Sequence, residues 1–312
     1  MKWFRCVLAY DGSGFAGWQR QPGQRTVEGA VAEALEKIFG HPVDISAASR
    51  TDAGVHALGQ VIGFGVETRL APELVLRALN SRLPEDVCAT VVEETFPGFD
   101  PRRHSYGKRY RYWIGDGPGW SPFLRHYQWQ WKRGRLDCHA MQEAARLLLG
   151  THDFACFQNT GSPRSSTTRT LYQVIVERVE PSRFSENVPP QKGRVGEGFW
   201  SWNRAEGRED LGAEAFLSQL WCRGGVFILV EGDGFLYNMV RSIVGTLVEV
   251  GRGARRPEWV GQVLASRDRR QAGPTAPPWG LYLEKVFCCD SIDGGITVPA
   301  SGTTQLPPLS TE

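Results

Sequence analysis

The segment Ser-Arg-Thr-Asp-Ala-Gly-Val-His-Ala, residues 49–57, lies between two stretches that have the composition of β-strands. It brings an arginine, an aspartate and a histidine into one short run with a turn at Gly54. Loops held between rigid strands often carry functional side chains. Because a nearby positive charge lowers the pKa of a carboxyl group, Arg50 predicts that Asp52 is ionised and available as a nucleophile or base. The alternative is that Asp52 only caps the turn.

On both sides of this segment, strands and helices follow each other in a regular order. Thr26 is a typical N-cap, and Gly40 is typical of the end of the helix that begins there. Periodicity predicts strands at residues 3–10, 43–48, 58–66, 87–92, 108–115, 171–179, 225–231 and 281–287, and helices at 27–38, 72–79, 137–150, 237–250 and after Pro257. The order strand, helix, strand, strand, helix, strand occurs twice and is the ferredoxin-like arrangement. The predicted fold class is therefore α+β, with two ferredoxin-like halves at residues 1–103 and 104–289.

Two segments interrupt this order. Residues 181–219 separate two predicted strands and are rich in Gly, Pro, Glu, Arg and Trp, so we interpret them as an inserted excursion of the second half. Residues 290–312 are rich in Gly, Thr, Ser and Pro and have no periodicity, which predicts a disordered tail.

The composition, with 41% hydrophobic and 22% charged residues in 312, is that of a soluble folded protein. The net charge is only +2, so the chain as a whole does not indicate a nucleic-acid partner. Basic residues nevertheless cluster beside aromatic residues, the mixture that single-stranded nucleic acid requires, although each cluster taken alone is equally consistent with a solvated surface. The clusters are Arg102 to His104, Lys108 to Arg111, Lys132 to Arg135 and Arg252 to Arg256.

The seven cysteines do not form a metal-binding or disulfide pattern. Their number is odd, they are mostly far apart, and no C-x-x-C or H-E-x-x-H spacing occurs. We therefore expect free thiols in a reducing cytoplasm, and no metal site. The amino terminus does not resemble a signal peptide and no apolar run approaches bilayer length, so no membrane association is expected.

Arg241 is the most informative residue outside residues 49–57. The helix expected at 237–250 places it on the apolar side, where an arginine is costly unless it is paired. One interpretation is that the side chain reaches solvent at the edge of the apolar stripe. The other is that Arg241 pairs with a buried carboxylate, for which Asp52 is the candidate.

Five motifs in this order resemble the tRNA pseudouridine synthase A family, over about residues 3 to 287. They are Tyr10-Asp11-Gly12-Ser13 with Gly17 to Gln21, Arg50 to Ala57, Lys108 to Tyr112, Met239 to Gly245, and Gly280 to Leu283. Two departures are visible. Ser49 stands where the family motif usually begins with glycine, and the excursion at 181–219 is longer than usual.

The resemblance implies two halves that meet in a central cleft, a cytoplasmic homodimer, and isomerisation of uridine to pseudouridine at positions 38, 39 and 40 in the anticodon stem-loop of tRNA, without a cofactor or metal. It implies that Asp52 is the catalytic nucleophile, that Arg50 acts beside it, that Tyr110 stacks on the target base, and that Arg241 is the basic partner of Asp52. Whether Asp52 attacks C1' of the ribose or C6 of the uracil, or abstracts a proton, stays open from the sequence.

Two other classes of function are consistent with part of the sequence. A non-catalytic tRNA-binding protein on the same fold would keep the basic and aromatic clusters but has no need of Asp52 on a glycine-containing turn. A metal-dependent phosphotransferase would need a second carboxylate near Asp52, and the local sequence does not supply one.

Overall fold

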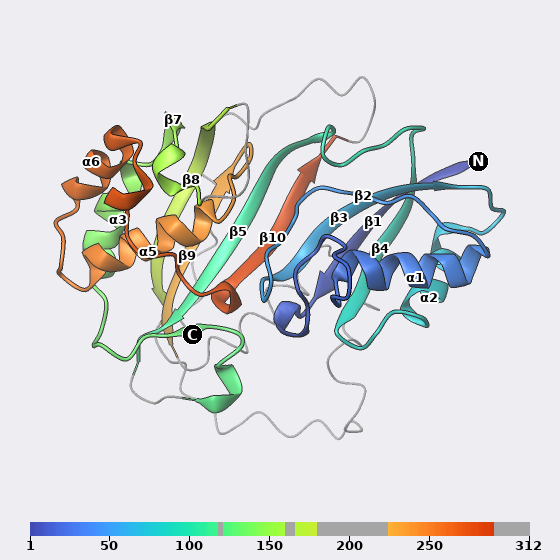
Figure 1. The fold of residues 1–312 in the computed structure, drawn as a ribbon, viewed down its shortest axis with the longest axis horizontal. Helices are drawn as coiled ribbons and strands as arrows, with labels where there is room; N and C mark the ends of the chain where they lie inside the picture. Colours follow the sequence, from blue (N-terminus) through green and yellow to red (C-terminus); the bar gives the residue numbers. More distant parts are fainter. Residues whose placement is uncertain (118–120, 160–165, 180–223, 290–312) are drawn as a thin grey trace, which may run out of the picture.

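The computed structural model describes residues 1–117, 121–159, 166–179 and 224–289. Within these residues the strands form one mixed ten-stranded sheet, with the order β4-β1-β3-β10-β5-β9-β8-β7 and with β2 paired to β3 and β6 paired to β5. Figure 1 shows α1 and α2 over the β1, β3 and β4 part of this sheet, and α3, α5 and α6 over the part that contains β8 and β9. Strands β5 and β10 lie in the middle.

The elements of the first half are β1 (Lys2–Tyr10), α1 (Val27–Phe39), β2 (Ser46–Ala47), β3 (His56–Val66), α2 (Pro72–Asn80) and β4 (Val87–Thr95). The residues predicted to begin and end the helices are found at the helix ends. Thr26 accepts a hydrogen bond from the backbone N–H of Gly29, Gly40 ends α1 in the left-handed conformation, and Pro72 is at the start of α2.

The strand predicted at residues 43–48 is mostly wrong, because only Ser46 and Ala47 form β2. Residues 43–45 form no strand pairing, and just beyond the other end of β2 a side chain takes over from the strand ladder. After Ala48 donates to the Val61 carbonyl, the backbone N–H and C=O of Ser49 both bond to the buried side-chain amide of Gln60. The chain therefore leaves the sheet at Ser49 without unpaired backbone groups.

The second half contains β5 (Ser105–Gly115), β6 (Trp129–Gln130), α3 (Cys138–Arg146), β7 (Gly150–Asp153), β8 (Thr168–Val179), β9 (Gly225–Gly232), α5 (Met239–Gly251), α6 (Glu258–Ser266) and β10 (Leu281–Cys288). Short 3-10 helices lie at η1 (Gly12–Gly14), η2 (Pro122–Leu124), η3 (Ala155–Phe157), η5 (Arg269–Gln271) and η6 (Pro278–Gly280). Two predicted helix boundaries are wrong. The helix from Asp137 ends at Arg146, since Gly150 has a positive φ and begins β7, and α5 begins after Asn238 rather than at Tyr237.

The two halves have the same strand order. In the first half the sheet runs β4-β1-β3-β2, and the four long strands of the second half run β10-β5-β9-β8, so each half places its fourth strand beside its first and its third beside its second. The halves join where β3 and β10 pair in parallel, with His56 opposite Tyr282 and Ala57 opposite Leu283. Residues 49–57 therefore end at the junction between the halves.

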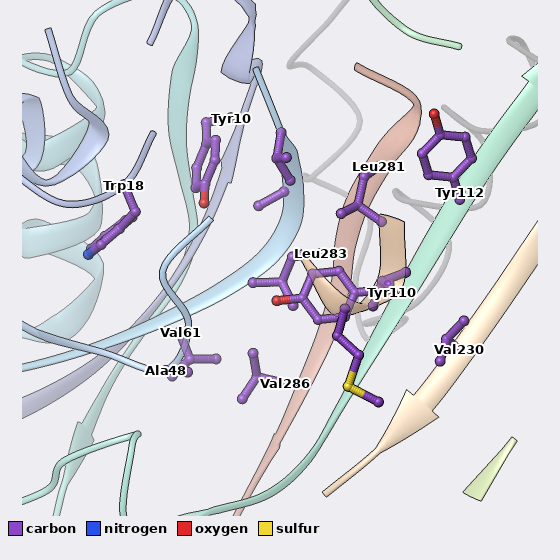
Figure 2. Packing of buried hydrophobic residues seen from close by; sticks show 14 of the residues in the cluster. Tyr10, Trp18, Ala48, Val61, Tyr110, Tyr112, Val230, Leu281, Leu283 and Val286 are labelled. Atoms are coloured by element: carbon purple, nitrogen blue, oxygen red, sulfur yellow. The ribbon is translucent and has the colours of Figure 1, made fainter. Parts of the chain in front are cut away.

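A continuous apolar core links the two halves at this junction. Leu283 of β10 is opposite Tyr110 of β5 in the antiparallel register, and Figure 2 shows both side chains among the buried residues between the halves. Leu283 is fully buried and Tyr110 nearly so. The packing at the centre of the molecule thus fixes how the first half meets the second.

Several predictions fall on other parts of the chain. The excursion expected at 181–219, the tail expected at 290–312 and Cys222 lie outside the described residues. The six cysteines that are described, Cys6, Cys88, Cys138, Cys156, Cys288 and Cys289, are all free thiols. Among the described helices, none has both the length and the apolar character needed to cross a bilayer.

Helix α5 packs directly on the segment that follows η5. The backbone N–H of Ala276 donates to the Arg241 carbonyl, and that of Gly273 donates to the Thr246 hydroxyl. A Cβ on Gly245 would overlap the carbonyl oxygen of Pro274. Only glycine permits this close approach.

We predict that Gly245→Ala lowers the free energy of unfolding by about 1–3 kcal/mol through overpacking. The matched control is Gly261→Ala in α6, where the nearest atom to an added Cβ would be Leu147 Cδ1 at 3.6 Å, an ordinary contact. That variant should be neutral or more stable by up to about 1 kcal/mol, because alanine is the better helix former. Chemical denaturation of both variants measures the difference, and equal stabilities would contradict the described packing of α5.

Candidate active site

The loop that carries Asp52 is held in place by the first strand and the glycine-rich segment after it. The Tyr10 hydroxyl and the Thr51 hydroxyl form a buried hydrogen bond of 2.8 Å, and the Trp18 backbone N–H donates to the Thr51 carbonyl at 3.0 Å. Gly17 has a φ of 98° and lies so close to the Thr51 carbonyl that a Cβ would be 2.8 Å from its oxygen. The residue before Asp52 is therefore fixed by both its side chain and its backbone.

Asp52 and Arg241 meet across the two halves, as the helical stripe predicted. Arg241 Nη1 lies 3.4 Å from Asp52 Oδ2, and the two side chains retain 15% and 22% of their exposure. Arg241 is oriented by two shorter hydrogen bonds, from Nε to the Ala276 carbonyl at 2.7 Å and from Nη1 to Asn238 Oδ1 at 2.6 Å. The guanidinium therefore keeps its position through its own half and reaches the carboxylate of the other half.

The expectation that Arg50 keeps the pKa of Asp52 below its ordinary value is wrong. Burial raises the pKa of Asp52 above its usual value, and this effect outweighs the charge and hydrogen bond of Arg241, which act in the opposite direction. Arg50 is exposed, and the arginine that contacts Asp52 is Arg241. The loss of hydration of the carboxylate therefore determines the direction in which the pKa of Asp52 shifts.

Tyr110, in β5, faces the loop that contains Asp52. Its hydroxyl lies 2.7 Å from the Ser49 hydroxyl, and its ring packs edge-on against Phe235 at a centroid distance of 5.0 Å. Burial raises the pKa of Tyr110 to about 12; the hydrogen bond to Ser49 opposes the rise and the charge of Asp52 adds to it. The structure thus brings Asp52, Arg241 and Tyr110 together, while the Arg50 side chain is exposed.

His56 is a residue of the same motif to which the sequence assigned no role. Its side chain is buried, with Nδ1 3.1 Å from the Gly12 backbone N–H and Nε2 2.8 Å from the His126 carbonyl oxygen. Its ring stacks on Tyr282 at 4.8 Å. The contact with His126 and the stacking on Tyr282 tie His56 of the first half to the second half.

Asp11 and Tyr127 extend this contact between the halves. The Tyr127 hydroxyl donates to Asp11 Oδ2 at 2.7 Å, and the Tyr282 hydroxyl donates to the Tyr127 carbonyl at 2.7 Å. Burial alone would raise the pKa of Asp11, but hydrogen bonds from His56, Ser13 and Tyr127 hold it well below its usual range. The motif histidine and the first glycine-rich segment therefore form one polar connection, which a sequence search for close Asp–His spacing cannot detect.

In one of the predicted basic clusters, Lys108 to Arg111, two arginines form ion pairs within the protein. Arg109 pairs with Glu231 at 2.8 Å, and Arg111 pairs with Glu284 at 2.7 Å. In the cluster Lys132 to Arg135, by contrast, the Arg133 guanidinium lies over the Trp131 ring at 5.7 Å. Sequence clustering alone does not distinguish an internal ion pair from a charge that faces solvent.

The described residues contain no group of three or more His, Cys, Asp or Glu side chains with metal-binding geometry.

Comparison with known proteins agrees with this arrangement. A sequence profile described as tRNA pseudouridine synthase matches residues 7–97 and 144–287. The chain is 39% identical to tRNA pseudouridine synthase A of Geobacillus kaustophilus over 284 residues, which cover 91% of this chain and 93% of the relative. It is 38% identical to the protein of the same name from Geobacter sulfurreducens over 286 residues, 92% of this chain and 99% of that protein, and 37% identical to that from Myxococcus xanthus over 286 residues, 92% of each. The chain belongs to the tRNA pseudouridine synthase family.

We predict that Asp52→Asn makes the protein more stable at neutral pH. The folded-state pKa of Asp52 lies above the ordinary value of 3.8, so the folded protein binds the proton more tightly than the unfolded chain. This contribution to stability is present at low pH and is lost as the pH rises from the ordinary value through the raised pKa. The gain in melting temperature from Asp52→Asn should therefore shrink as the pH falls towards the ordinary value. Asp44→Asn, which alters an exposed carboxylate of the same half, is the control, and a gain independent of pH would contradict the prediction.

We predict that Arg241→Ala lowers the free energy of unfolding by about 2–4 kcal/mol, somewhat less than for a fully buried pair because both side chains keep some exposure. Asp52→Asn should stabilise the Arg241→Ala protein more than it stabilises the wild type, because it removes a carboxylate that has lost its partner. The coupling free energy of this double-mutant cycle, from chemical denaturation, is the quantity to measure. Additive effects would mean that the two charges do not interact.

Proposed function

We propose that this chain isomerises uridine to pseudouridine in the anticodon stem-loop of tRNA, with Asp52 as the nucleophile. Membership of the tRNA pseudouridine synthase family supports the reaction and the substrate. The observation that supports the role of Asp52 is its contact with Arg241 at 3.4 Å, in which each half of the protein supplies one partner.

The reaction rearranges bonds without redox chemistry or hydrolysis. The C1'–N1 glycosidic bond breaks, a C1'–C5 bond forms, the C5 proton leaves and N1 gains a proton. This chemistry needs a carboxylate close to the sugar and the uracil, and surroundings that keep the detached base while it turns. Asp52 provides the carboxylate, and its desolvation makes it less stabilised by water than an exposed aspartate.

The other residues have supporting roles. Arg241 stabilises the negative charge of Asp52 and holds it towards the reacting atoms, because its Nε and Nη1 are already anchored to the second half. Tyr110 supplies an aromatic face for a base that has left the stack, and its position beside Asp52 supports this role. The exposed Arg50 is available to the phosphate backbone of the RNA.

We further propose that the chain consists of two ferredoxin-like halves, residues 1–103 and 104–289, around a central cleft. The strand order shared by β4-β1-β3-β2 and β10-β5-β9-β8 supports this division. The family resemblance is the support for a homodimer, for a cytoplasmic location and for a reaction without a cofactor or metal.

A non-catalytic tRNA-binding protein is the alternative. Such a protein would gain nothing from a partly buried carboxylate, whose desolvation lowers the stability of the fold. The close relatives over nine tenths of the chain also favour the enzyme.

We predict that Asp52→Asn abolishes pseudouridine formation while tRNA binding stays close to that of the wild type. The amide keeps the shape of the carboxylate but is not a nucleophile. Release of tritium from tRNA that contains 5-tritiated uridine measures turnover, and filter binding measures affinity. Asp44→Asn should be fully active, and appreciable turnover by Asp52→Asn would remove Asp52 from the nucleophile role.

A further inference from the structure

Ser49 and Tyr110 form another side-chain contact between the halves, beside the one of Asp52 with Arg241. Their hydroxyl oxygens are 2.7 Å apart, and Ser49 precedes Asp52 by only a few residues in the same loop. Figure 2 shows the Tyr110 side chain extending from β5 towards the first half, with its hydroxyl at the leading end.

The Ser49 hydroxyl is a rigid anchor because the backbone that carries it is fixed. The Gln60 amide donates to the Ser49 carbonyl at 2.6 Å and accepts from its N–H at 3.2 Å. Gln60 is fully buried in β3, so this anchor belongs to the sheet rather than to a free loop. The serine side chain then has only one rotatable bond between the backbone and its hydroxyl oxygen.

The Tyr110 ring is constrained at both ends. Phe235 packs against the ring, and Leu283 is its neighbour on β10. With only 7% of the residue exposed, the hydroxyl depends on a protein partner, since a buried hydroxyl without one is costly. Ser49 supplies that partner, which a residue without a side-chain hydroxyl could not do.

We infer that Ser49 is a positioning residue of the reaction, which fixes the orientation of the Tyr110 phenol beside Asp52 through the hydrogen bond between the two hydroxyl groups. The inference rests on the proposed role of Tyr110 at the target base. The Ser49 hydroxyl is then a functional feature of this chain, which couples the aspartate loop to the stacking tyrosine.

The test is a double-mutant cycle on the single-turnover rate of tritium release. Ser49→Ala should lower this rate about three- to tenfold, the range expected for the loss of one hydrogen bond that orients a group in the transition state. Tyr110→Phe should lower it by a similar factor, and the double variant should be no slower than Tyr110→Phe alone. The matched control is Ser46→Ala, which removes a half-buried serine hydroxyl that donates to the Gly63 carbonyl at 3.2 Å in the same connection.

Melting temperatures and tRNA affinity are measured in parallel, and Ser49→Ala should match Ser46→Ala in both, so that a lower rate cannot come from misfolding or weak binding. A normal rate for Ser49→Ala together with a slow Tyr110→Phe would overturn the inference and leave the role of Tyr110 intact. Normal rates for both Tyr110→Phe and Tyr110→Ala would overturn the role of Tyr110 and the inference with it. Independent, multiplicative rate losses in the double variant would also overturn the inference, because Ser49 would then act by another route.

Discussion

The parallel pairing of β3 with β10 is the constraint on which the candidate site depends. It joins the halves through only two residue pairs, His56 with Tyr282 and Ala57 with Leu283. Asp52 lies just before this pairing, and Arg241 is on α5 of the other half. A small rotation of one half about this junction would therefore change the distance between the carboxylate and the guanidinium. The hydrogen bonds and ring stacking of His56 resist that rotation from both sides.

The electrostatics at Asp52 are decided by burial rather than by its partner. At 3.4 Å the contact with Arg241 is longer than the two hydrogen bonds that Arg241 makes within its own half, so the guanidinium is only partly committed to the carboxylate. Desolvation then outweighs the attraction and raises the pKa of Asp52. The Asp52 carboxylate is therefore incompletely hydrated before any substrate binds. Its burial lowers the free energy of unfolding, a cost that is typical of functional sites.

The sequence predicted most of the secondary structure and the contact between Asp52 and Arg241. Caps at Thr26 and Gly40 are local signals, and the apolar stripe of α5 identified an arginine that needed a partner. The failures have a different origin. Gln60, which bonds to the Ser49 backbone just after β2, is 11 residues from Ser49 in sequence, and the bond between Ser49 and Tyr110 crosses the halves. Local sequence also does not report burial, so the direction of the Asp52 pKa shift was wrong.

The basic and aromatic residues of β5 are adjacent in sequence but do not form one surface. Side chains alternate between the two faces of a strand. The residues from Lys108 to Tyr112 are therefore divided between two faces of the sheet and do not form a single basic and aromatic patch. Arg109 and Arg111 share one face, where Glu231 and Glu284 neutralise them. Tyr110 is on the other face, in contact with Ser49. The arginines thus bind β5 to its neighbours β9 and β10, and this rigid sheet is what holds Tyr110 at a fixed position opposite the Asp52 loop.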